Sequence, residues 1–250
     1  MRVHRSRRVP ATLLILLFSV AVSGCAIPRT WHYPPTPPGT LLNLKAAKAV
    51  PVKVAVQPLR DLRGENANES SWMVAIPLVP YGVDSFDRPE NYETLEGAPL
   101  IRMTPSRDFA RAIADELRNA GVFSSVTYED GNAPAADLVL TGSVKTTGWR
   151  RAYTTYMLGP VGPLLWMLGA PIATTTNRVV IDLQLAPAGS AQTLWKFSIE
   201  FEDRHVIGAY YGSSESVENY SEAVQEATKL ALEDLVKRAT QTPEALQPPK

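Results

Sequence analysis

Two runs of alternating side chains, at residues 179–185 and 195–201, constrain the fold of this chain more than any other feature. In both runs every second residue is a large apolar one, and this period of two is typical of a half-buried strand. A Pro-Ala-Gly-Ser cluster at 187–190 lies between them and favours a turn. The runs therefore predict an antiparallel pair of strands that share one buried face.

Two other segments have the periodicity of amphipathic helices. The first begins at Thr104-Pro105, where Thr favours the N-cap and Pro the first turn, and it ends at Gly121. Its apolar residues recur at every fourth position: Phe109, Ile113 and Leu117. The second is predicted from Asn219, which has capping-box spacing with Glu222, to the basic residue Arg238.

Shorter strands are predicted at 52–56, 122–128 and 137–145. The order of elements is strand, helix, two strands, hairpin strands, helix. This order predicts one α+β domain over residues 50–240, in which two helices pack on a mostly antiparallel or mixed sheet.

The first 24 residues have the composition of a secretory signal peptide. Four arginines precede an uncharged apolar run at 9–22, and two small residues follow it. The run is shorter than the roughly 20 apolar residues that a membrane-spanning helix needs. The quartet Val22, Ser23, Gly24 and Cys25 resembles a lipobox, the cleavage site of bacterial lipoproteins. This resemblance implies that residues 1–24 are removed and that Cys25 is acylated, which would anchor the chain to a membrane.

The residue after the cysteine bears on localisation. In lipoproteins of Gram-negative bacteria, Asp at this position tends to retain the protein at the inner membrane, so Ala26 implies by resemblance the outer membrane, facing the periplasm. In a cell with one membrane, the anchor would hold the protein to the cell membrane. Cys25 is the only cysteine of the 250 residues, so no intramolecular disulfide can form.

Proline content predicts how the two ends of the mature chain behave. Five prolines in residues 25–49 predict an extended tether between the anchor and the domain. Residues 241–250 contain three more prolines, and we expect a flexible tail there.

Composition argues against a nucleic-acid partner and against catalysis. Removal of the signal peptide takes four of the 25 basic residues and leaves 21 against 25 acidic ones, which is not the footprint of a nucleic-acid binder. His205 is the only histidine of the folded body, and the sequence contains no nucleophile elbow, phosphate loop or zinc-ligand set. We therefore expect no catalytic residue, no metal and no cofactor. A pocket that joined His205 to Glu202 and Asp203 would favour an enzyme of unknown class instead.

Three short segments carry a resemblance to a group of envelope proteins. They are 52–56 leading to Asp61-Leu62-Arg63, the helix start at 104–108, and the strand at 136–142. With these features the chain resembles small bacterial lipoproteins of the YajG, LpoB and CsgG-like kind, including the PelC-type export lipoproteins. The resemblance implies an α+β domain in the cell envelope.

Two apolar segments without any charged residue, at 72–81 and 152–177, do not belong to that pattern. Three glycines and three prolines in 156–171 argue against a continuous membrane helix, and we expect a loop with one helical turn at 164–168. The segments either fold back over an open face of the sheet or form an exposed apolar surface for a membrane or a partner. The candidate contact residues are Trp72, Ile76, Leu78, Tyr81, Tyr156, Leu158, Leu164, Leu165, Trp166, Met167 and Leu168.

The sequence therefore predicts a membrane-anchored, non-catalytic adaptor or accessory subunit that uses this apolar loop surface. Its expected partners are the membrane, through the lipid anchor, and another envelope protein or a second copy. An oligomeric component of an export channel or of an envelope complex is the alternative.

Overall fold

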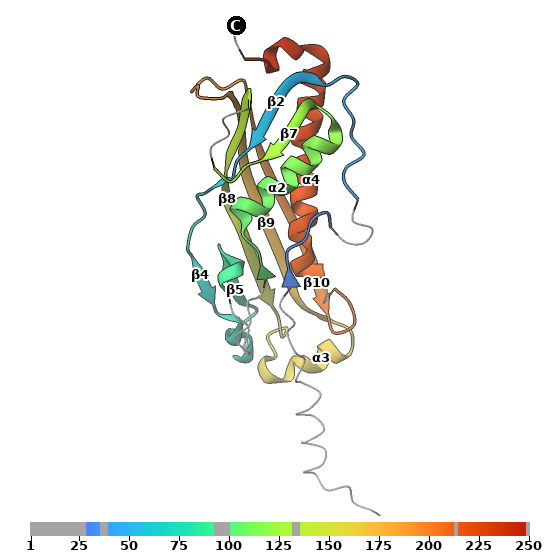
Figure 1. Ribbon diagram of the computed structural model, residues 1–250. Helices are drawn as coiled ribbons and strands as arrows, with labels where there is room; N and C mark the ends of the chain where they lie inside the picture. Colours follow the sequence, from blue (N-terminus) through green and yellow to red (C-terminus); the bar gives the residue numbers. More distant parts are fainter. Residues whose placement is uncertain (1–28, 36–39, 93–100, 132–135, 213–214, 249–250) are drawn as a thin grey trace, which may run out of the picture.

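A mixed sheet, with eight strands among the described residues, runs along the length of the molecule (Figure 1). The computed structural model describes residues 29–35, 40–92, 101–131, 136–212 and 215–248. The sheet has the order β10-β9-β8-β2-β7, with β3 and β5 also paired to β8 and with β4 paired to β5. Its strands are β2 (Val50–Val56), β3 (Arg60–Asp61), β4 (Ala67–Glu69), β5 (Gly82–Phe86), β7 (Phe123–Tyr128), β8 (Leu138–Tyr153), β9 (Pro171–Pro187) and β10 (Trp195–Gly208).

Strand direction divides the sheet into two parts. The long strands β8, β9 and β10 form an antiparallel meander in which Ile199 lies opposite Ile181. The short strand β2 lies between β7 and β8 and is parallel to both. A separate parallel pair joins β1 (Arg29–Thr30) to β6 (Ile101–Arg102). The mixed sheet confirms the predicted α+β class.

Two long helices, α2 (Pro105–Ala120) and α4 (Glu215–Gln241), cover one face of the sheet (Figure 1). Side chains of Phe109, Ile113 and Leu117 are buried against it, as their spacing predicted. Gly121 ends α2 with φ of 64°, a left-handed conformation that favours glycine. Burial of each large apolar side chain stabilises the fold by about 1.5–3 kcal/mol. No helix among the described residues is long and apolar enough to cross a membrane.

Short helical turns lie in the connections. They are η1 (Ser71–Ala75), η2 (Pro89–Asn91), η3 (Gly159–Val161), α3 (Pro163–Met167) and η4 (Pro243–Leu246). The turn α3 confirms the helical turn expected near 164–168.

Several elements are longer than the sequence predicted. β8 continues to Tyr153 and β9 begins at Pro171, so the loop expected over 152–177 covers only 154–170. The predicted strands end where the large apolar residues end, but Thr175 and Asn177 continue the buried face of β9. α4 begins at Glu215, so Asn219 lies inside the helix and does not cap it. Thr104 is the N-cap residue of α2, although its side chain makes no capping hydrogen bond.

The segment expected to be an extended tether lies against the domain in its described parts. Trp31 packs on Phe109, with 5.2 Å between the ring centroids, and Ala46 N donates to the Ala120 carbonyl. Tyr33 Oη donates to Glu116 Oε1 at 2.6 Å, and the Leu42 backbone N–H donates to the other carboxylate oxygen at 2.9 Å. The packed domain therefore includes residues 29–35 and 40–49.

The tail also differs from the expected flexible segment in its described part. Residues 243–246 form η4, and Leu246 is fully buried in the core. A buried leucine at this position packs η4 into the hydrophobic core beside α4.

Candidate functional site

Three loops meet at the end of the sheet where α3 lies, at the lower end of Figure 1. They are residues 71–81 before β5, 154–170 between β8 and β9, and 209–212 after β10. They meet because β8 and β10 run toward this end and β5 and β9 run away from it. We call the exposed apolar side chains of these loops the end surface.

The end surface is apolar and strongly exposed. The exposed fraction of the residue is 82% for Leu168, 81% for Leu78, 74% for Tyr210 and 66% for Trp72. The other exposed members are Ile76, Tyr81, Tyr156, Met157, Leu158, Val161, Leu164, Met167 and Tyr211. None of residues 71–83, 152–177 or 206–212 is Asp, Glu, Lys or Arg. The end of the domain thus has no charged side chain in any of its three loops.

These positions decide between the two arrangements that the sequence left open. Residues 72–81 and 154–170 do not fold back over the sheet; they extend beyond its end and expose most of their apolar side chains. Among the eleven predicted contact residues, Leu165 and Trp166 are half-buried and the other nine are exposed. Their role as contact residues stays a prediction.

Hydrogen bonds between the first two loops hold them together. Thr155 Oγ1 donates to the Val74 carbonyl at 2.7 Å, and Leu78 N donates to the Met157 carbonyl at 2.9 Å. Gly159 approaches the first loop so closely that a Cβ there would lie 2.9 Å from the Ala75 carbonyl oxygen. The two segments, about 80 residues apart in the sequence, therefore form one preorganised unit.

The third loop joins this unit through its tyrosines. Tyr210 Oη donates to the Met167 carbonyl at 2.8 Å, and Tyr211 Oη donates to the Gly169 carbonyl at 3.3 Å. These two tyrosines are not among the predicted contact residues, and neither are Met157 and Val161. The uncharged run Gly-Ala-Tyr-Tyr-Gly at 208–212, directly after an alternating strand, is the signal that could have found the tyrosines.

Backbone strain is concentrated in the end surface. Leu78, Tyr156 and Met157 have φ of 69°, 59° and 64°, and they are the only non-glycine residues with positive φ in the described chain. Side chains larger than glycine are disfavoured in this region. Such strain accumulates at functional sites, where the surrounding structure enforces it.

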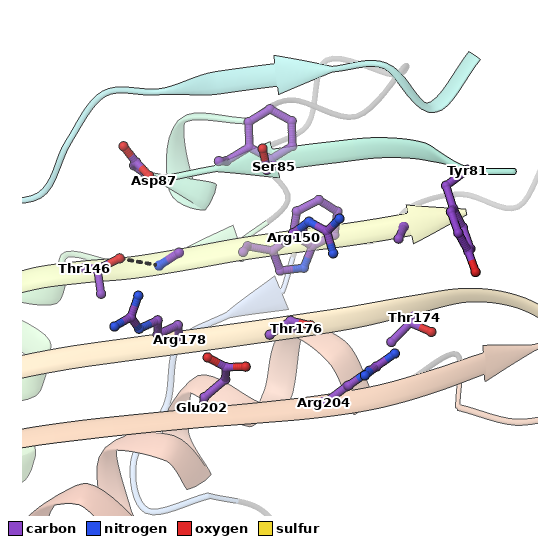
Figure 2. A pocket seen from close by; sticks show the side chains of 14 residues that line it. Tyr81, Ser85, Asp87, Thr146, Arg150, Thr174, Thr176, Arg178, Glu202 and Arg204 are labelled. Carbon is purple, nitrogen blue, oxygen red and sulfur yellow. Dashed lines mark hydrogen bonds between the residues drawn. The ribbon is translucent and has the colours of Figure 1, made fainter. Parts of the chain in front are cut away.

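A groove of about 640 Å³ lies beside the end surface, on the face of the sheet that α2 and α4 leave open (Figure 2). Tyr81 belongs to both the groove and the end surface. The groove is lined mainly by hydroxyl and charged side chains, among them Ser85, Thr146, Arg150, Thr174, Thr176, Arg178, Glu202 and Arg204.

Glu202, Asp203 and His205, whose meeting in one pocket would favour an enzyme, do not all line this groove. His205 lies beside Asp203, with which its Nε2 makes a hydrogen bond, and only Glu202 of that trio lines the groove. No group of three His, Cys, Asp or Glu side chains in the described residues is placed to hold a metal ion. The absence of catalysis stays a prediction.

A buried ion-pair network lies further along the sheet. Arg63 Nη2 donates to Asp61 Oδ2 at 2.9 Å and to Glu90 Oε1 at 2.5 Å, and its Nη1 donates to Thr147 Oγ1 at 2.7 Å. Arg88 binds the same Asp61 oxygen at 2.9 Å. The Arg63 guanidinium is thus paired with two carboxylates within the fold.

The predicted lipidation site lies outside the described residues, as do Val22, Ser23 and Gly24 of the lipobox. The described chain begins at Arg29, four residues after Cys25, so the two are at most about 14 Å apart. Figure 1 shows β1 in the half of the molecule that ends in α3. Ser221 in the first part of α4 donates to the His32 carbonyl, which fixes the N-terminal segment in that half.

No protein-family model matches this chain, and no curated protein matches it. Among solved structures, a DUF330-family protein from Xanthomonas campestris is 10% identical, with a TM-score of 0.45 over 84% of this chain and 97% of that one. Dodecameric PelC from Paraburkholderia phytofirmans is 15% identical, with a TM-score of 0.35 over 77% and 92%. Rare lipoprotein B from Shewanella oneidensis is 16% identical, with a TM-score of 0.30 over 57% and 92%. PelC and a lipoprotein are thus among the structures that this chain is similar to.

Proposed function

We propose that this chain is a non-catalytic envelope lipoprotein that is held to one membrane twice, by an acylated Cys25 and by the end surface seated in the same bilayer. In that position it serves as an accessory subunit and presents the rest of the domain to other envelope components. The observation that carries the proposal is the end surface, where three segments distant in the sequence expose apolar side chains without any charge among them.

Exposure on this scale is costly in water. Leu78 and Leu168 are each more than four-fifths exposed, and burial of a leucine side chain is worth roughly 1.5–3 kcal/mol. Large contiguous apolar patches on a soluble domain mark contact surfaces. The strained backbone at Leu78, Tyr156 and Met157 adds to that cost, which supports a selected function for the surface.

Two features favour a bilayer over a protein as the occupant. Four exposed tyrosines, at 81, 156, 210 and 211, accompany the aliphatic side chains, and aromatic rings of this kind concentrate at membrane–water interfaces. Strand β1, where the described chain begins, lies in the half of the molecule that carries the end surface. Its first residue, Arg29, is at most about 14 Å from Cys25 along the chain. An acyl chain on Cys25 and the end surface could therefore reach the same membrane without any rearrangement of the domain.

The proposal is tested with a mature chain that starts at residue 26, exported by a signal peptide without a lipobox, and mixed with neutral phosphatidylcholine vesicles. Flotation is expected to bring the protein up with the vesicles. A Leu78→Glu/Leu168→Glu variant should lose roughly tenfold in partition for each leucine. The matched control is Leu230→Glu, because Leu230 is 52% exposed on α4, away from the end surface, and its replacement should leave partition unchanged.

A wild-type chain that stays with the buffer would contradict the bilayer as occupant. Photo-cross-linking in cells from position 168 of the full-length protein then separates the other occupants. A single adduct with a foreign protein would indicate an adaptor, and a ladder of self-adducts would indicate an oligomeric complex.

A further inference from the structure

We infer that Arg150 and Arg204 form a binding site for the phosphate of an anionic lipid headgroup, on the open face of the sheet just above the end surface. This inference rests on the proposed seating of the end surface in a bilayer. It adds a specificity for lipid class that the apolar loops cannot supply.

Strand register creates the site. Arg150 on β8 lies opposite Thr176 on β9, and Thr176 lies opposite Arg204 on β10, so the three residues form one row across the sheet. Figure 2 shows Arg150 and Arg204 on either side of Thr176. Neighbouring strands lie about 4.8 Å apart, which places the two arginine backbones about 10 Å apart. Two long guanidinium side chains at that spacing can reach a single phosphate group between them.

Neither arginine is used by the fold. Both residues are exposed, and within the described part of the chain neither guanidinium makes an ion pair or a hydrogen bond. Arg178, the third arginine of the groove, is by contrast paired with Glu200 through Nε and Nη2. Free guanidinium groups with their fork of donors suit bidentate binding of phosphate.

The acidic groups of the groove lie on the side away from the end surface. Glu202 precedes Arg204 by two residues on β10 and is therefore farther from the loops. Asp87 accepts hydrogen bonds from the backbone and side-chain nitrogens of Asn66. The half of the groove nearest the loops has Arg150 and Arg204 as its charged groups, together with the hydroxyls of Ser85, Thr174 and Thr176.

The distance from this row of residues to the end of the sheet fits the position of the lipid headgroup layer. Arg150 lies three residues before the end of β8 at Tyr153, and Arg204 lies four residues before the end of β10 at Gly208, which is about 10–13 Å along the strands. Interfacial protein surfaces enter the boundary between headgroups and acyl chains by about 5–10 Å. Side chains that extend from this row therefore meet the phosphate layer when the end surface is seated.

The test compares the mature chain on neutral vesicles and on vesicles that contain phosphatidylglycerol, at low salt. Each basic side chain near an anionic surface is worth about fivefold in partition. We expect Arg150→Gln/Arg204→Gln to lose about 25-fold on the anionic vesicles and nothing on the neutral ones. The matched control is Arg60→Gln, an exposed arginine on β3 whose partner on β8 is Ser143, seven residues farther from the end surface.

Arg150→Lys/Arg204→Lys keeps the charge and removes the fork of donors, so it should still lose several-fold on anionic vesicles. Binding equal to wild type by this lysine variant, or a loss by Arg60→Gln as large as that of the glutamine variant, would overturn the site in favour of diffuse attraction. Thermal stabilisation by inorganic phosphate that the glutamine variant abolishes, with no gain from phosphatidylglycerol, would assign the site to free phosphate. If the end surface does not insert into a bilayer, the wild-type chain fails to bind neutral vesicles. That outcome is distinct from a failure of the arginine site, which affects binding to the anionic vesicles alone.

Discussion

Individual residues at one end of this molecule combine a strained backbone conformation with an exposed apolar side chain, and both features lower the stability of the fold. Leu78, Tyr156 and Met157 adopt left-handed backbone conformations, and each turns a large apolar side chain toward solvent. A left-handed conformation costs a non-glycine residue roughly 1–2 kcal/mol. Elsewhere in the described chain positive φ occurs only at glycine, so this strain is specific to the end surface.

Replacement of Met157 by glycine should therefore separate stability from membrane binding. Met157→Gly should raise the free energy of unfolding by up to about 1 kcal/mol, because the relieved strain exceeds the extra entropy of glycine in the unfolded chain. It should also weaken partition into neutral vesicles, because the apolar side chain is gone. Met157→Ala is the control, since it removes the side chain and keeps the strain. Urea unfolding that shows no gain for glycine over alanine would contradict the strain argument.

The ion pairs around Asp61 give the fold a dependence on acid. The Arg63 guanidinium lowers the pKa of Asp61 to about 2, from an ordinary value near 3.8. Because the folded-state pKa is depressed, this stabilisation is complete above about pH 4 and is lost as the pH falls through about 2. Asp61→Asn should thus be less stable than wild type at neutral pH, and the difference should narrow toward pH 2. Urea midpoints measured across this range test the prediction, which a constant difference would refute.

At the scale of elements, the N-terminal segment is a structural part of the domain. Glu116 on α2 is fully buried, and its carboxylate accepts hydrogen bonds from Tyr33 and from the Leu42 backbone. Burial, together with the hydrogen bond to Glu116, raises the pKa of Tyr33, so that the hydroxyl stays a donor at alkaline pH. The segment between the anchor and β2 is therefore attached to the helical layer at several points.

Tyr33→Phe should loosen this attachment. A hydrogen bond to a charged group contributes roughly 1.5–3 kcal/mol, and the variant leaves a buried carboxylate oxygen without that donor. Thermal unfolding should occur at lower temperature, and limited proteolysis within residues 40–49 should be faster. Tyr210→Phe, which removes an exposed hydrogen bond to a neutral carbonyl, serves as the control. Equal stability of the two variants would show that Tyr33 contributes only through its ring.

At the scale of the whole molecule, the long antiparallel strands define the long axis of the domain. β9 has 17 residues and spans about 55 Å at about 3.3 Å per residue. The end surface lies at one end of it, and the β9–β10 turn near Ala188 lies at the other. A domain seated on its end surface would therefore stand upright on the membrane.

Fluorophores at the two ends should detect this orientation. Cys25 is the only cysteine, and acylation would block it, so Leu168→Cys and Ala188→Cys each provide a single labelling site in the lipidated protein. Brominated acyl chains should quench a fluorophore at position 168 and leave one at 188 unaffected. Equal quenching at the two positions would mean that the domain lies flat on the bilayer.

Local patterns in the sequence determined the elements. Alternation at 179–185 and 195–201 marked the hairpin, and the spacing of Phe109, Ile113 and Leu117 marked α2, because side-chain period follows directly from backbone geometry. The absence of charge in 72–81 and 152–177 also identified most of the end surface. Strand ends were underestimated where Thr175 and Asn177 replace apolar residues on a buried face, since polarity alone carries no information about what covers a side chain.

Only the tertiary structure decided what these segments form together. Residues 72–81, 154–170 and 209–212 meet because β5, β8, β9 and β10 alternate in direction within one sheet, and strand pairing is a long-range property that no local pattern contains. The same pairing places Arg150 and Arg204 in one row across β9. The Pro-rich segment packs on the domain because Glu116 and Phe109, more than 70 residues away, supply its partners. The sequence by itself thus determined which segments are apolar, helical or extended, and the tertiary structure determined which of them share a surface, because contact depends on the path of the whole chain.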